Sequence, residues 1–144
     1  MPPLTALESA LRAHGQNITA ARRTVFTALQ GEEPLSMHDL IDRCDGVDRA
    51  SVYRAVALFE QLGIVQRLQT GWKYRLELSD EFHEHHHHAT CMLCGQSQVI
   101  VEDTVVEQHL RRLAKELGFQ LEKHQLELQG YCTKCQDLLK DFKD

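Results

Sequence analysis

The sequence predicts an α+β protein with two domains, and three observations lead to that fold class. Apolar residues recur at helical spacing in successive segments of the first half. Two short runs rich in strand-forming residues follow, joined by a Thr-Gly turn. The second half mixes strand-like and helical segments around a histidine run and two Cys-x-x-C pairs. We therefore expect an N-terminal winged helix-turn-helix over residues 1–80 and a C-terminal α/β domain over residues 81–144.

Four helices are expected before the first strand. Leu4, Leu7 and Leu11 give the first, within residues 4–14. The next three begin after side chains that accept hydrogen bonds from free helical N–H groups, and glycines at positions 31, 46 and 63 end them. These expected caps are Thr19, Ser36 and Asp48. Their apolar faces are expected to comprise Val25, Phe26, Leu29, Met37, Leu40, Ile41, Cys44, Val52, Val56, Leu58, Phe59 and Leu62.

The hairpin after the fourth helix supplies the wing. Its strands are IVQRLQ and WKYRLEL, with the turn at Thr70-Gly71. The polar segment SDEFHE then marks a boundary near residues 79–84. Further on, residues 98–101 predict a strand and residues 119–131 predict one or two. A helix capped by Asp103 or Thr104 reaches about Leu117 with an apolar stripe, and QDLLKDFKD predicts a last short helix.

Composition limits the class of protein. The 144 residues are 42% hydrophobic, which is enough for a core. The formal net charge of −5 gives no general argument for nucleic acid, but arginines cluster in the first half. There is no 18-residue apolar run, and the amphipathic N-terminus lacks a signal-peptide apolar segment. We therefore expect a cytoplasmic protein without a membrane partner.

The two Cys-x-x-C pairs predict a zinc site. Thiolates at positions i and i+3 of a tight turn can share one ion, and two such turns complete a tetrahedron. In a reducing compartment, a zinc site is favoured over the alternatives, which are a redox disulfide pair or two unrelated turns with buried thiols. A structural zinc site contributes about 10–16 kcal/mol of apparent binding energy, more than the stability of most small domains. The expected ligands are Cys91, Cys94, Cys132 and Cys135, whereas Cys44 is expected in a helix core.

The histidine run predicts two half-sites for metal. If residues 85–88 are extended, successive side chains point to opposite faces. His86 and His88 then share one face, and His85 and His87 share the other. Imidazoles with carboxylate partners suit Zn²⁺, Fe²⁺, Mn²⁺ or Ni²⁺. The alternative is a solvated polar loop.

These features together resemble the ferric uptake regulator family of metal-responsive transcription factors. The resemblance is carried by NITAARRTVFTAL, DRASVYRAVALFEQLGIV, HHHHATCMLC and the final YCTKC, which cover nearly the whole chain in the family's order. It implies a winged-helix DNA-binding domain, a C-terminal α/β dimerisation domain, and a homodimer that represses transcription from a palindromic operator in double-stranded DNA when metal is bound.

The resemblance also implies residue roles. The four cysteines of the two pairs match structural Zn²⁺ ligands. His86 and His88, with Glu77 from the hairpin, match a regulatory site for Zn²⁺ or Fe²⁺, with Mn²⁺ as a further candidate. His85, His87, Glu107 and His124 match a second site inside the dimerisation domain. Tyr53 and Arg54 match the recognition helix, and Arg22, Arg49 and Ser51 are expected beside them on DNA.

The chain departs from the family pattern around the regulatory site. Pro34 stands near where many members place a histidine ligand, and Gln66 stands where zinc sensors carry an acidic residue. The alignment of the hairpin could bring Arg75 instead of Glu77 to the ligand position. The segment at residues 80–84 adds His83 and Glu84 as candidates, and Glu102 is another candidate carboxylate.

Alternative functions remain open at this point. A peroxide-sensing repressor of the same family is one, although its members usually need aspartate in the hairpin position. A zinc-storage or zinc-ribbon adaptor would explain the cysteines but not RASVYR. A hydrolytic metalloenzyme would leave the helix-turn-helix half unexplained, and no HExxH helix is present.

Overall fold

The computed structural model describes residues 3–31, 33–70, 72–82 and 84–141, and these form two compact units. Unit 1 spans Met1–Glu84 and unit 2 spans His85–Asp144. The predicted turn residue Gly71 and the candidate ligand His83 lie outside the described residues. Within the described part, no helix is long and apolar enough to cross a membrane.

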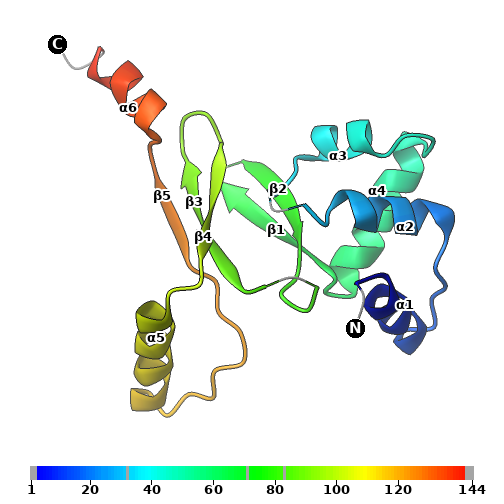
Figure 1. Ribbon diagram of the computed structural model, residues 1–144, viewed down its shortest axis with the longest axis horizontal. Helices are drawn as coiled ribbons and strands as arrows, with labels where there is room; N and C mark the ends of the chain where they lie inside the picture. The colour runs from blue at the N-terminus through cyan, green and yellow to red at the C-terminus, as the bar shows by residue number, and fades with distance from the viewer. Residues whose placement is uncertain (1–2, 32, 71, 83, 142–144) are drawn as a thin grey trace. The chain divides into compact units, whose positions relative to one another are not determined.

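In the described residues of unit 1, four helices precede a hairpin (Figure 1). The helices are α1 (Pro3–Ala13), α2 (Ala20–Ala28), α3 (Met37–Arg43) and α4 (Arg49–Gln61). The strands β1 (Val65–Thr70) and β2 (Lys73–Leu78) pair antiparallel, with Gln66 opposite Glu77. The side chains of Thr19, Ser36 and Asp48 each accept a hydrogen bond from the backbone N–H three residues later, so these three predicted N-caps are present.

One hydrophobic core holds unit 1 together. The apolar stripes of the four helices meet the inner face of the hairpin, and Phe26, Leu40, Phe59 and Leu76 are completely buried there. Leu35 pairs with Leu76 through two backbone hydrogen bonds, which attach the segment before α3 to the hairpin. Burial of side chains of this size stabilises a fold by about 1.5–3 kcal/mol each.

The segment after the hairpin packs onto unit 1. The backbone N–H of Ser79 donates to the carbonyl of Ile64 at 2.8 Å. The ring of Phe82 meets that of Phe26 edge to face, with centroids 5.4 Å apart. The first part of the predicted boundary segment at 79–84 therefore belongs to unit 1.

The described residues of unit 2 form a three-stranded sheet with two helices. Its strands are β3 (His86–Cys91), β4 (Ser97–Val101) and β5 (Glu127–Gly130), in the order β4-β3-β5. β4 pairs antiparallel and β5 parallel with β3. The helices α5 (Thr104–Glu116) and α6 (Thr133–Lys140) lie at opposite ends of this sheet (Figure 1). Asp103, not Thr104, caps α5.

Two expectations for unit 2 differ from the structure. The segment 119–131 forms a strand only at its end, because residues 119–126 must span from α5 to the edge of the sheet. The predicted apolar stripe of α5 lies mostly outward: Val105 is 74% and Leu117 82% exposed. The residues that α5 buries are Glu107 and Ala114. The helix therefore offers a carboxylate to the interior and apolar side chains to its surroundings.

Candidate metal centres and DNA-binding face

The four cysteines come together at one end of the sheet in unit 2. Cys91 ends β3, Cys94 follows in the tight turn, and Cys132 and Cys135 lie at the start of α6. Their sulfurs all lie within 4.8 Å of one another, and those of Cys94 and Cys132 are 3.9 Å apart. Zn–S bonds of 2.3 Å in a tetrahedron require sulfurs about 3.8 Å apart. The arrangement thus fits one zinc ion.

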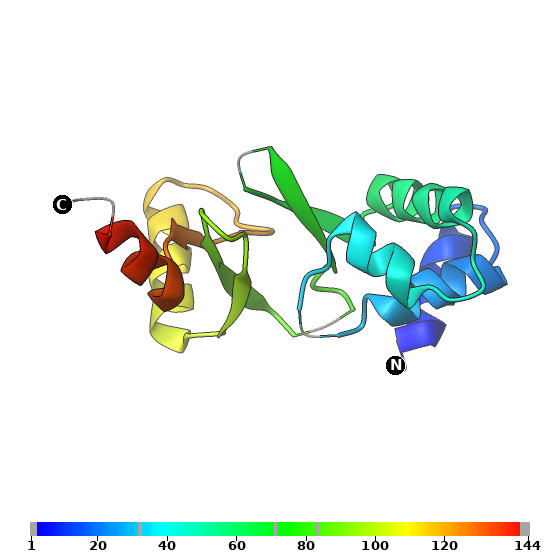
Figure 2. The same ribbon diagram turned by 90° about the horizontal axis from the view of Figure 1, so that it is seen from above.

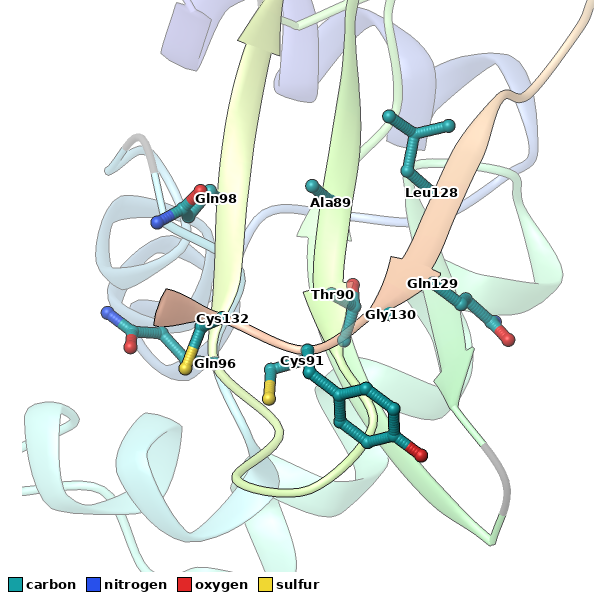
Figure 3. A pocket seen from close by; sticks show the side chains of 10 residues that line it. Ala89, Thr90, Cys91, Gln96, Gln98, Leu128, Gln129, Gly130 and Cys132 are labelled. Carbon is teal, nitrogen blue, oxygen red and sulfur yellow. The ribbon is translucent and has the colours of Figure 1, made fainter. Parts of the chain in front are cut away.

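Local structure explains why these sulfurs converge. The parallel register places Cys91 opposite Gly130, so the start of α6 follows directly beside the end of β3. Figure 3 shows the side chains of Cys91 and Cys132 at this end of the sheet. Cys132 occupies the N-cap position of α6 but makes no capping hydrogen bond. Cys91 and Cys132 border a groove of about 190 Å³. The lining of this groove also includes Ala89, Gln98 and Leu128 from the three strands.

The thiols differ in their readiness to ionise. Backbone N–H groups of Cys132 and Cys94 lower the pKa of Cys91 to about 6. Burial, followed by hydrogen bonds with the neighbouring sulfurs, raises the pKa of Cys135 to about 12. Four thiolates this close repel one another, so all four can ionise together only around a cation. The donor set therefore fits a divalent ion better than a group of free thiols.

Three imidazoles and one carboxylate converge at a second place in unit 2. The Oε1 atom of Glu107 lies 2.5 Å from Nε2 of His87 and 3.2 Å from Nε2 of His85. Its Oε2 atom lies 2.5 Å from Nε2 of His124. His87 and Glu107 are 4% and 3% exposed, so the centre is closed to water on their side.

The imidazoles of this cluster also contact one another. The Nε2 atoms of His85 and His124 lie 3.1 Å apart, so at least one of them must offer a lone pair. Burial acts to raise the pKa of Glu107, but the hydrogen bond from His87 and the charges of His124 and His85 outweigh it and lower the pKa. One carboxylate and three imidazoles with ligand atoms within 4.8 Å form a set that suits a divalent transition metal.

His86 and His88 form a separate pair on the other face of β3. Their Nε2 atoms are 3.1 Å apart, and His88 is 4% exposed. The alternation predicted for an extended run is therefore present: one strand sends its imidazoles to two faces. In unit 1, Glu77 is buried and accepts a 2.6 Å hydrogen bond from Gln66. The alternative candidate, Arg75, directs its guanidinium to the carbonyl of Pro34.

The predicted DNA-binding residues gather at the N-terminal half of α4 and on α2. Arg49 and Arg54 are exposed, Tyr53 is 45% exposed, and Ser51 is partly buried. Arg54 donates to the Ser51 hydroxyl at 2.9 Å, and that hydroxyl donates to Asp48 at 2.6 Å. These contacts orient the first turn of the helix.

Arg22 is partly buried, whereas the other predicted arginines, Arg49 and Arg54, are exposed. Its guanidinium donates to the carbonyl of Asn17 at 2.5 Å, which uses part of its hydrogen-bonding capacity. Arg23 beside it is exposed on the same helix. Glu102, the other candidate carboxylate, is exposed after β4. The ligand clusters within unit 2 do not contain it, as far as the described residues show.

The chain is similar to known proteins over most of its length. The model of the ferric uptake regulator family matches residues 13–129. The ferric uptake regulation protein of Vibrio anguillarum is 34% identical over 133 residues, which cover 86% of each chain. The solved structure of the Vibrio cholerae ferric uptake regulator is 32% identical with a TM-score of 0.70, covering 87% of this chain and 98% of that one. The Helicobacter pylori regulator shares the fold, with a TM-score of 0.74 at 23% identity and coverage of 93% and 91%.

A winged helix joined to a unit rich in metal ligands defines a metal-responsive, DNA-binding regulator of transcription. The chain belongs to the ferric uptake regulator family. Its members bind DNA, form dimers and are not enzymes, so the hydrolytic alternative is excluded. The predicted fold class and family are thereby confirmed.

Proposed function

We propose that this chain is a metal-dependent repressor of metal-homeostasis genes that binds a palindromic operator as a homodimer. Cys91, Cys94, Cys132 and Cys135 hold a structural Zn²⁺. Glu77, His86 and His88 bind the regulatory ion, which is Zn²⁺ or Fe²⁺, with Mn²⁺ as a further candidate. His85, His87, Glu107 and His124 form a second site. Arg22, Arg49, Ser51, Tyr53 and Arg54 contact DNA.

The observation that carries this proposal is that the histidine run sends its side chains to two opposite faces of β3. On one face, His85 and His87 meet a buried carboxylate and a third imidazole, which is a complete ligand set within unit 2. On the other face, His86 and His88 bring two imidazoles together among the described residues of unit 2. Two ligands bind a divalent ion weakly, so a regulatory site needs further donors. The resemblance supplies Glu77 of unit 1 as the additional donor.

Ligands drawn from both units would couple metal to DNA binding. A carboxylate on β2 and imidazoles on β3 that share an ion restrict how the winged helix is held against the dimerisation unit. In a dimer this restriction favours one separation between the two α4 helices, which must match the half-site spacing of the operator. Shifting such an equilibrium from 1:99 to 99:1 needs about 5.5 kcal/mol of differential binding. Three or four protein ligands to one ion are sufficient for that demand.

The test is metal-dependent DNA binding by the purified protein. Zn²⁺, Fe²⁺ or Mn²⁺ is added to protein that retains its structural zinc, and binding to a duplex selected from random sequence by the wild-type protein is measured. We expect one of these ions to raise affinity for DNA at least about a hundredfold. His88→Ala should lose this response while keeping the structural zinc. His109→Ala, which changes an exposed histidine of α5, should respond like the wild type.

The same measurement separates the other functions. A chain that binds no duplex with any divalent ion would be a storage or adaptor protein, and the repressor proposal would be wrong. Peroxide sensing predicts that the Fe²⁺-loaded protein loses DNA affinity on brief exposure to H₂O₂ while the Zn²⁺-loaded protein does not. Peroxide sensors of the family usually carry aspartate at this hairpin position, whereas this chain has Glu77, which argues for metal sensing.

A further inference from the structure

Arg75 lies on the same face of the β1–β2 hairpin as the proposed metal ligand Glu77. The helices of unit 1 lie on one side of the hairpin (Figure 2), and Leu76 and Leu78 are buried in the core there. Side chains alternate along a strand, so Arg75 and Glu77 share the opposite face, about 7 Å apart along the strand. The hydrogen bond of Glu77 with Gln66, directly opposite it on β1, agrees with this placement.

The segment before α3 brings Pro34 to the neighbourhood of the same carboxylate. Leu35 pairs antiparallel with Leu76, and continuing this register by one residue places Pro34 beside Glu77. The Nη1 atom of Arg75 lies 3.5 Å from the carbonyl oxygen of Pro34. The family resemblance implies a histidine ligand near position 34 in many members, but proline has no side-chain ligand atom. A guanidinium therefore reaches the region where the resemblance implies a further metal ligand.

The charge of Arg75 opposes a divalent ion bound at Glu77. An arginine side chain in a protein stays protonated, so this positive charge is permanent. Glu77 is buried and Arg75 is partly buried, so solvent screens a charge here less than it does at the surface. Gln66, the hydrogen-bond donor to Glu77, is neutral and adds no negative charge. The surroundings of the carboxylate therefore disfavour a cation more than those of a carboxylate without an arginine nearby.

We propose that the fixed positive charge of Arg75 sets the metal concentration at which the regulatory site fills. It weakens binding of the ion that Glu77 shares with the two imidazoles of the site. The contact with the carbonyl of Pro34 keeps the guanidinium near the carboxylate. The site then responds to a higher concentration of free metal than it would with a neutral residue at position 75. This inference rests on the proposed regulatory site, but it requires no choice among Zn²⁺, Fe²⁺ and Mn²⁺.

The metal affinity of variants that lack this charge tests the proposal. Protein that retains its four-cysteine zinc is titrated with Zn²⁺ in competition with a chromophoric chelator. The binding step that is missing from His88→Ala identifies the regulatory site. Arg75→Gln and Arg75→Met both remove the charge, but only the glutamine amide can still donate a hydrogen bond to the Pro34 carbonyl. Both variants should bind Zn²⁺ at this step at least about tenfold more tightly than the wild type. The free Zn²⁺ needed for half-maximal DNA binding should fall by a similar factor.

Two control variants separate the charge of Arg75 from its shape and its position. Arg75→Lys keeps the positive charge and should bind Zn²⁺ within about twofold of the wild type. Lys73→Gln removes one positive charge from an exposed position of the same strand. That position is about 13 Å from Glu77 along β2, which exceeds the screening length of about 8 Å at physiological salt. The metal affinity of Lys73→Gln should therefore stay near that of the wild type. Circular dichroism and thermal unfolding check the folding of each variant.

The possible outcomes separate this inference from the proposed function. Unchanged or weaker Zn²⁺ binding in the two neutral variants overturns the inference, because the charge would then not oppose the ion. An increase in affinity that Arg75→Lys or Lys73→Gln shares also overturns it, because the effect would not come from the charge at this position. In each of these cases the regulatory site remains. If no binding step is missing from His88→Ala, the proposed regulatory site itself is wrong.

Discussion

The two units of this chain are stabilised by different chemistry. Unit 1 buries a continuous apolar core drawn from all four helices and the hairpin. In the described part of unit 2, the buried side chains are mainly sulfur, imidazole and carboxylate groups, namely Cys91, Cys135, His87, His88, Thr90 and Glu107, with Ala114. Its large apolar residues, such as Val105 and Leu117, are exposed. For a unit this small with so little apolar burial, we expect bound metal and a partner surface to supply much of the stability.

This contrast separates DNA reading from metal response. The winged helix keeps its shape through hydrophobic burial, which does not depend on metal supply. The buried groups of unit 2 are those of the proposed metal sites, so we expect its structure to follow metal occupancy. The exposed apolar side of α5 is compatible with the dimers that the family forms.

The largest effect should come from removing a structural zinc ligand. In Cys135→Ser, we expect zinc at the four-cysteine site to be lost, unit 2 to unfold and dimers to dissociate. Metal analysis and sedimentation measure these losses, and the helical signal of unit 1 should persist. Cys44→Ala is the matched control, because Cys44 is buried in the core of unit 1 and should not affect zinc content. Loss of zinc in the control would contradict the assignment.

A core substitution in unit 1 should destabilise unit 1 and leave the zinc content of unit 2 unchanged. Phe59 is completely buried, and Phe59→Ala should lower the free energy of unfolding of unit 1 by about 3–5 kcal/mol through lost burial and a cavity. Thermal unfolding followed by circular dichroism measures this, while zinc content should remain that of the wild type. Phe119→Ala, at a 65% exposed position, should change unit 1 little. Equal effects of the two variants would show that the units do not unfold separately.

The second site should be removable without loss of the first. Glu107→Gln replaces the buried carboxylate with a neutral amide, a poor metal ligand, and leaves three imidazoles around it. We expect one metal ion fewer for each chain and a lower unfolding temperature, with the four-cysteine zinc retained. Glu116→Gln at the exposed end of α5 is the control. Unchanged metal content in Glu107→Gln would refute a metal site at this cluster.

The smallest effect concerns the pH dependence of the recognition helix. The side-chain hydrogen bond from Ser51, followed by its backbone hydrogen bond, lowers the pKa of Asp48. The carboxylate therefore stabilises the folded state fully above the ordinary carboxyl pKa of about 4, and this is lost as the pH falls through the lower folded value. Asn still caps a helix but does not titrate. Asp48→Asn should thus make unit 1 less sensitive to acid in thermal unfolding, and an unchanged acid sensitivity would contradict this role of Asp48.

Local patterns predicted the elements of unit 1 closely. Its helices begin at capping residues, and each buries apolar residues that recur three or four positions apart. They predicted less of unit 2. The alternation in residues 119–131 suggested more strand than exists, since pairing partners and not alternation decide whether a strand forms. The sequence showed the apolar stripe of α5. It did not show whether that stripe packs inside the chain or faces outward.

The sequence by itself determined the helix caps, the hairpin, the Cys-x-x-C turns and the alternation of the histidines, because each depends on residues a few positions apart. It also determined the family, through the order of those motifs. The family resemblance implied that Glu107 and His124 join His85 and His87, but residue spacing alone did not, and only the tertiary structure shows these four side chains together. That meeting depends on the parallel register of β5 beside β3 and on the placement of α5. Such long-range contacts arise from the packing of whole elements, which no local spacing of residues records.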